Sequence, residues 1–186
     1  MKISLNLSGP PSVAVDGARV EFATKKAEAI FYYTALKGQV SKQSLELMFW
    51  PELDEAHANK NLRNSIYYIT RIFGAGVFKK SRGVLEFSGS VEFVENIDPL
   101  RGRFMEGFYL KDCPDFNSFV DEYNNSRDMQ LYNSAKANFL RALSVGELDD
   151  METLNRYGAL SRMDPYDEEV VFALMEHCFG EGRLDE

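Results

Sequence analysis

The first 87 residues show an order of hydrophobic patterns that few folds can accommodate. Apolar and polar residues alternate over residues 2–7, which is typical of a half-buried strand. Two short β-like runs follow in residues 12–22 and flank an Asp-Gly pair, a strong signal for a hairpin. The spacing of apolar residues then becomes helical over residues 25–37, with Gly38 as a C-cap. This order predicts an α+β domain that begins with a small sheet.

Two more helices and a hairpin complete the pattern. Ser41 is a good N-cap for a short helix that ends at Trp50-Pro51. Asp54 caps a longer helix, which runs to Phe73 and is closed by a glycine. The stretch VFKKSRGVLEF, residues 77–87, then predicts two strands around a Lys-Ser-Arg-Gly turn. Strands, three helices and a hairpin, in this order, predict a winged helix-turn-helix.

Charge is distributed unevenly along the chain, whose net charge is −8. Residues 1–95 hold 12 basic and 10 acidic residues, a net charge of +2, and residues 96–186 hold 9 and 19, a net charge of −10. Residues 56–85 contain no acidic residue but six basic ones: Lys60, Arg63, Arg71, Lys79, Lys80 and Arg82. Such a stripe predicts a footprint for nucleic-acid phosphates. The alternative is a solvated face whose acidic partners come from elsewhere in the fold.

The third predicted helix has two faces of different chemistry. Its apolar stripe, expected to be buried, consists of Leu62, Ile66, Ile69 and Phe73. The opposite side carries Lys60, Asn64, Tyr67, Tyr68 and Arg71, with Arg63 on the flank. Arginine can pair with guanine and asparagine with adenine in the major groove, so this face predicts DNA recognition. An ordinary amphipathic helix would explain the apolar stripe equally well, but not the absence of acidic residues.

The predicted hairpin would form the wing of this domain. Lys79, Lys80 and Arg82 lie at or near its tip, where they could reach phosphates or the minor groove. The alternative for these three residues is a turn that only adds solubility.

The letters DEAH at residues 54–57 spell the ATPase box of a helicase family, but the rest of that chemistry is missing. A helicase needs a phosphate-binding loop of the form GxxxxGK[ST]. The nearest candidate, GAGVFKKS at residues 74–81, has the wrong glycine spacing and would lie in the wing. Asp54 is better explained as an N-cap, and with Glu55 it suits the positive end of the helix dipole.

The acidic second half of the sequence is predicted to be helical. Residues 115–143 form a long helical stretch, and residues 151–163 and 165–179 form two more. The first stretch spaces Phe116, Phe119, Val120, Tyr123, Leu131, Ala135, Phe139 and Leu143 for burial. Helix pairs joined by short turns predict a tetratricopeptide-like array, which usually binds peptides or proteins. The alternative is a domain that only dimerises or braces the first one.

Catalysis and metal binding find little support in the sequence. Cys113 and Cys178 are far apart and form no ligand spacing with His57 or His177, so no catalytic residue, metal site or cofactor is predicted. No apolar run approaches the roughly 20 residues that span a bilayer, and no secretion signal is evident. We therefore expect a cytoplasmic protein with reduced thiols and no membrane contact.

Both halves resemble one known family. LSGPPSVAVDGARV and the stretch from KKAEAIFYYTALKG to ITRIFG are similar to the DNA-binding half of SARP-type bacterial transcriptional activators. LRGRFMEGFYLKDCPDFNSFVDEYNNSR and ALSRMDPYDEEVVFALMEHCFGEGR are similar to that family's activation domain. The resemblance implies an OmpR-like winged helix in residues 1–95 and an all-α, tetratricopeptide-like domain in residues 96–186. The passage between the two is shorter than usual, and the last repeat is expected to be incomplete.

The resemblance also implies further partners. The loop between the second and third helices, with Trp50 and Glu52, would contact RNA polymerase; a structural turn with Trp50 as a core plug is the alternative. The helical domain would serve regulation, dimerisation or protein contact.

Two functions stay open at this point. The first is a sequence-specific activator that binds double-stranded DNA, and the second is a protein-interaction adaptor with only non-specific DNA affinity. If the first is right, Arg71→Ala and Asn64→Ala should weaken binding to a cognate site more than to random DNA, and Lys79→Ala should weaken both equally.

Overall fold

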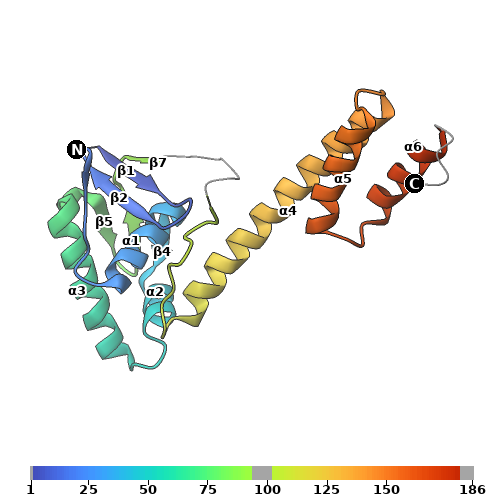
Figure 1. The fold of residues 1–186 in the computed structure, drawn as a ribbon. Coiled ribbons are helices and arrows are strands. Elements are labelled where there is room, and N and C mark those ends of the chain that lie inside the picture. Colours follow the sequence, from blue (N-terminus) through green and yellow to red (C-terminus); the bar gives the residue numbers. More distant parts are fainter. Residues whose placement is uncertain (1, 94–101, 181–186) are drawn as a thin grey trace. The chain divides into compact units, whose positions relative to one another are not determined.

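The computed structural model describes residues 2–93 and 102–180, and these fall into two compact units, Met1–Asn124 and Asn125–Glu186 (Figure 1). The predicted domain boundary between residues 95 and 96 lies outside the described residues.

The first unit opens with a small mixed sheet in the order β3-β2-β1-β7. Its strands are β1 Ile3–Asn6, β2 Ser12–Val15, β3 Ala18–Arg19 and β7 Val91–Phe93. The predicted hairpin is confirmed: Asp16 and Gly17 both have positive φ angles, 48° and 86°, at the turn between β2 and β3. β7 pairs with β1 in parallel and was not expected from the sequence.

Three helices follow the sheet at the predicted positions. They are α1 Lys25–Lys37, α2 Lys42–Phe49 and α3 Glu55–Phe73. Thr24, Ser41 and Asp54 cap their N-termini, each accepting a hydrogen bond from a backbone N–H three residues on. Asp54 of the DEAH letters is therefore an N-cap, as predicted, and its carboxylate also lies 2.5 Å from Nδ1 of His57.

The wing is a hairpin of β5 Phe78–Ser81 and β6 Val84–Phe87, joined at Arg82-Gly83. A third strand, β4 Gln39–Ser41, pairs with β6 and attaches the wing to the start of α2. Residues 74–81, the nearest match to a phosphate-binding loop, run through the 3₁₀ turn η1 Ala75–Val77 into β5. A phosphate-binding loop instead leads into a helix, so this stretch lacks the required geometry.

One aromatic core holds the first unit together. Phe31 of α1 and Phe73 of α3 are buried and stacked, with ring centroids 4.3 Å apart and planes 8° from parallel. The same core includes Phe104, Phe108 and Phe116 from the segment after the wing. Residues that the sequence analysis assigned to the helical half thus contribute to the core of the winged helix.

A buried amide fastens this later segment. Asn124 accepts a hydrogen bond from the backbone N–H of Phe104 at 2.8 Å and donates one to its carbonyl at 3.0 Å. The side chain is only 6% exposed, so both backbone groups would lack a partner without it.

The second unit is helical. It contains the later part of α4 Pro114–Ser144, with α5 Asp150–Met163 and α6 Glu168–Gly180. Tyr132, Phe139, Leu160 and Val170 form its core. Two residues of α4 that were expected to be buried are exposed: Ala135 in this unit and Tyr123 in the first unit. The helix predicted for residues 165–179 is α6, and it begins at residue 168 because Asp167 caps it by accepting from the N–H groups of Glu169 and Val170.

Asp167 also links α6 to α4 within this unit. Its carboxylate accepts hydrogen bonds from the Tyr132 hydroxyl at 2.7 Å and from Nζ of Lys136 at 2.9 and 2.7 Å. Lys136 lies 2.7 Å from Glu169 as well. The bonds from Lys136 and Tyr132 lower the pKa of Asp167 to about 2.

This cluster predicts a pH dependence of the second unit's stability. Because the pKa of Asp167 is lowered on folding, its contribution is complete above its ordinary value of 3.8 and is lost as the pH falls toward 2. Asp167→Asn should therefore lower the free energy of unfolding at pH 7 and have little effect near pH 2. Urea unfolding followed by helical circular dichroism at both pH values measures the difference. An equal loss at both values would show that the charge of Asp167 is unimportant.

Candidate nucleic-acid interface

The two faces of α3 are as the sequence predicted. Leu62, Ile66, Ile69 and Phe73 are all buried in the first unit. The opposite row is exposed along its whole length: Lys60, Arg63, Asn64, Tyr67, Tyr68 and Arg71. Six residues of donor-rich or aromatic type thus share one solvent-facing side of a 19-residue helix.

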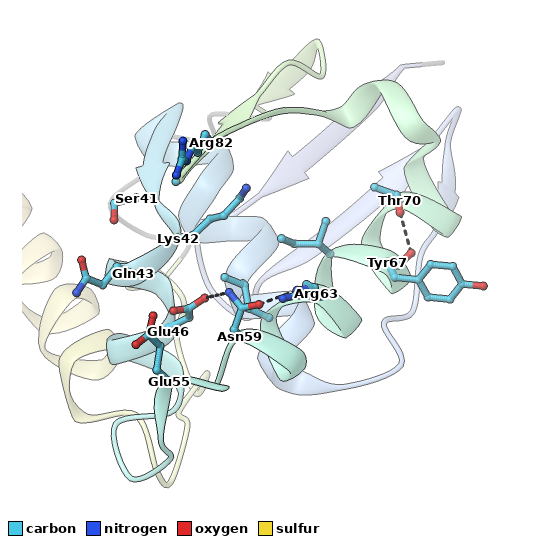
Figure 2. Close-up of a pocket in the computed structure, with 13 residues that line it drawn as sticks. Ser41, Lys42, Gln43, Glu46, Glu55, Asn59, Arg63, Tyr67, Thr70 and Arg82 are labelled. Carbon is cyan, nitrogen blue, oxygen red and sulfur yellow. Dashed lines mark hydrogen bonds between the residues drawn. The ribbon is translucent and has the colours of Figure 1, made fainter. Parts of the chain in front are cut away.

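A groove of about 820 Å³ lies between the start of α2, the flank of α3 and the tip of the wing (Figure 2). Leu62 and Ile66 contribute its apolar part. Its polar lining includes three cations and two amides: Lys42, Arg63, Arg82, Gln43 and Asn59. The groove therefore combines positive charge with hydrogen-bond donors, a combination suited to phosphates and to base edges.

Three of the predicted DNA-binding residues line this groove: Arg63, Tyr67 and Arg82. Others lie on the exposed face of α3 but do not line it: Lys60, Asn64, Tyr68 and Arg71. On the wing, Nζ of Lys79 lies 3.2 Å from the carboxylate of Glu86 on the neighbouring strand. The backbone of Lys80 belongs to β5, and its side chain lies outside the described residues.

Aromatic contacts order the far half of the α3 face. The Arg71 guanidinium lies over the Tyr67 ring, 6.0 Å from its centroid. The rings of Tyr67 and Tyr68 meet edge to face at 5.8 Å. Because a guanidinium stacked on a ring has fewer accessible rotamers, Arg71 is partly oriented before any partner binds.

Lys42 was missed by the sequence analysis. Its backbone N–H donates to the carbonyl of Gly83 at 2.9 Å, and its Nζ donates to the carbonyl of Ser81 at 2.8 Å. Both bonds hold the wing tip against the first residue of α2. The sequence contains a signal only for the Ser41 cap, because the bond from Lys42 to Ser81 joins residues 39 positions apart.

Asn59 and Glu46 were also missed. Glu46 of α2 is 8% exposed, and its Oε1 accepts a hydrogen bond from Nδ2 of Asn59 at 2.7 Å. Oδ1 of Asn59 in turn accepts from Nε of Arg63 at 2.6 Å (Figure 2). Glu46 and Glu55 both line the groove, so the acid-free stretch of the sequence is not an acid-free surface.

The loop after α2 shows one packed and one exposed residue. Trp50 is half-buried; its ring contacts that of Phe49 at 6.2 Å, and Nζ of Lys26 lies 5.5 Å above it. Glu52 is exposed. The position of Trp50 agrees with its alternative role as a plug, while the polymerase contact of Glu52 stays a prediction.

Within residues 2–93 and 102–180, no cluster of three or more metal-ligating side chains occurs. Cys113 is buried and Cys178 half-buried, and neither forms a disulfide. Over the same residues, no helix has the length and hydropathy needed to span a membrane.

Comparison with known proteins supplies a structural relative. No family model matches the sequence, and no curated protein matches it. Among solved structures, the chain is similar to Mycobacterium tuberculosis EmbR in complex with a low-affinity phosphopeptide, with a TM-score of 0.66 at 14% identity. The match covers 97% of this chain. This chain has the fold of the matched part of EmbR.

The likeness supports the SARP-type fold that the resemblance implied, and the predicted winged helix followed by a helical domain is confirmed. The chain spans about half of its relative's length, since the match covers 55% of the EmbR chain. At 14% identity the likeness establishes the fold, and the chemistry of the site must come from this chain's own residues.

Proposed function

We propose that this protein is a sequence-specific, DNA-binding transcriptional regulator of the activator type. α3 enters the major groove with Asn64, Tyr67 and Arg71 toward the base edges, and the wing contacts the backbone or minor groove through Arg82. The observation that carries the proposal is the exposed row on α3, which contains three cations, an amide and two tyrosines but no carboxylate. The EmbR-like fold supports the same docking geometry.

The helical unit has a separate role in this proposal. Its last helix, α6, exposes Phe172, Met175 and Phe179, which are 61%, 49% and 57% exposed and share one side of the helix. Exposed apolar stripes of this kind mark protein contacts. The helical unit therefore serves regulation, self-association or contact with a protein such as RNA polymerase. In the first unit, the exposed Glu52 before α3 adds an acidic point of contact.

A protein-interaction adaptor is the second candidate. It is favoured by Glu46 and Glu55 in the groove and by the pairing of Lys79 with Glu86, which together reduce the positive potential of the DNA-facing surface. Under this alternative, DNA binding would be weak and independent of sequence.

Salt dependence of binding separates the two candidates. Lys60 and Arg82 are exposed cations that are not placed on base edges, and two phosphate contacts predict a log–log slope of about −2, at roughly −0.9 per contact. Fluorescence anisotropy of the full chain with a labelled duplex, from about 50 to 300 mM KCl, measures this slope, because salt in this range screens exposed charges progressively. The duplex is chosen by selection from a random library, and an unselected duplex is the control.

The regulator proposal expects tight binding to the selected duplex that survives excess competitor. Binding that vanishes with modest salt and is equal for both duplexes would contradict it and favour the adaptor. Arg82→Ala should lower the affinity for both duplexes equally and reduce the slope by about one, because a wing cation on a phosphate carries no sequence information.

A further inference from the structure

The hydrogen-bonded chain Glu46–Asn59–Arg63 suggests a device for orienting one recognition side chain. The two bonds, of 2.7 and 2.6 Å, run from α2 to α3 and then along α3 to an exposed arginine at the groove. Arg63 is four residues after Asn59, one helical turn away, so the pair lies on one flank of α3.

The chemistry of the amide gives this chain a direction. An asparagine side chain donates through its nitrogen and accepts through its oxygen. A carboxylate can only accept and a guanidinium can only donate, so one orientation of the Asn59 amide satisfies both neighbours. The reversed amide would place its oxygen against Glu46 and its nitrogen against Arg63. Glu46, which is 8% exposed, thereby determines which way the Asn59 oxygen faces.

The consequence for Arg63 is a choice between its two hydrogen-bonding edges. Nε is occupied by Asn59, which blocks the edge formed by Nε and one terminal nitrogen. Within the described residues, the two Nη nitrogens have no hydrogen bond or ion pair, and together they form the end-on fork. Such a fork matches two acceptors at once, as O6 and N7 of guanine present them.

Two carboxylates offset part of the positive charge that Lys42 and Arg82 supply around the fork. Glu46 and Glu55 line the same groove, and both carboxylates repel a phosphate group. A guanine edge is neutral and is less affected by them. The hydrogen-bonded chain Glu46–Asn59–Arg63 therefore orients the guanidinium and adds no attraction for DNA of its own.

We propose that Asn59 and Glu46 are positioning residues that hold the Arg63 guanidinium end-on in the groove to read one guanine. This inference rests on the proposed function and names the base for one side chain of the same site. It assigns a role to two residues that touch no DNA themselves, one of them acidic.

The test uses the full chain, the duplex selected by the wild-type protein and variants of that duplex at each G·C pair. Arg63→Ala should lose about 5- to 150-fold in preference at one G·C pair, the range of a bidentate base contact. Asn59→Ala should reduce the preference at the same pair, and it should add no further loss in the Arg63→Ala background. Glu46→Gln should reduce the preference at this pair by less than Asn59→Ala does, since its amide can either accept from Asn59 or donate to it and no longer fixes the Asn59 orientation. It should also raise affinity for random DNA.

A second measurement examines the free protein. The Nε–H proton of Arg63, followed by nitrogen-15 NMR, should exchange slowly in the wild type, faster in Glu46→Gln and fastest in Asn59→Ala. Thermal unfolding of each variant shows whether it folds. If Asn59→Ala does not fold, Arg63→Ala still tests the guanine assignment, because Arg63 is exposed and its replacement should not unfold the protein.

The outcomes separate the two proposals. If the wild type shows no sequence preference, the regulator proposal fails and this inference falls with it. If the wild type discriminates but Arg63→Ala lowers affinity for every duplex equally, the regulator proposal stands and Arg63 is a phosphate contact, which overturns the guanine assignment. Additive losses from Asn59→Ala and Arg63→Ala would overturn the positioning role.

Discussion

Phe31→Ala should lower the free energy of unfolding of the first unit by about 3–5 kcal/mol, the usual range for a buried phenylalanine. Phe31 is fully buried, stacks on Phe73 and also contacts the rings of Phe22 and Phe87 at 5.5 and 5.7 Å. Its removal leaves a cavity between α1 and α3 that a rigid aromatic cluster cannot close. Since small domains are stable by only about 5–15 kcal/mol, the variant should also bind DNA poorly at 37 °C.

Fluorescence of Trp50 during urea unfolding measures this loss. Trp50 is the chain's single tryptophan and packs against the same core, so its signal reports on the first unit rather than the second. Tyr109→Ala is the matched control, because Tyr109 is an aromatic residue of the first unit that is 62% exposed. It should change the free energy of unfolding by no more than about 0.5 kcal/mol. Similar losses from both variants would contradict the assignment of Phe31 to the core.

The double variant Asn64→Ala/Arg71→Ala should lose most of its discrimination between a selected and an unselected duplex. Each side chain is exposed on α3, and a good base contact contributes about 1–3 kcal/mol of discrimination. Two such contacts correspond to a loss of roughly 30- to 10⁴-fold in the ratio of the two affinities. Arg71 should contribute strongly because it is already oriented on the Tyr67 ring. Anisotropy titrations of both duplexes measure the ratio.

Lys79→Ala is the control for that experiment. The structure refines the earlier expectation for this residue, since its ammonium group is paired with Glu86 and only part of its charge is available to a phosphate. We expect a small loss of affinity, equal for both duplexes. If the double variant and Lys79→Ala reduced both affinities alike, the α3 face would be a general phosphate surface.

Local signals explain why the helices of the first unit could be predicted closely. α1 occupies the predicted residues 25–37, and α2 and α3 begin directly after the predicted caps Ser41 and Asp54. Caps act through hydrogen bonds to residues two or three positions away, so they are visible in a short window of sequence. β4 and β7 were not predicted, because strands of three residues form only when distant partners supply their hydrogen bonds.

The difference between short-range signals and contacts of distant residues also explains which parts of the site could be predicted. The helical period alone placed Lys60, Asn64 and Arg71 on the exposed side of α3, opposite Leu62 and Ile69. It could not show that Lys79 is paired with Glu86, because the ladder between β5 and β6 sets which side chains face each other.

By itself, the sequence determined which segments become helices, where α2 and α3 are capped and which side of α3 faces solvent. These properties depend on residues within about one turn of each other. Only the tertiary structure decided that Lys42 holds the wing, that Glu46 accepts a hydrogen bond from Asn59, and that the segment around Phe104 and Phe116 belongs to the core of the first unit. The two hydrogen bonds join residues 39 and 13 positions apart, and no periodic pattern specifies a hydrogen bond across such a distance.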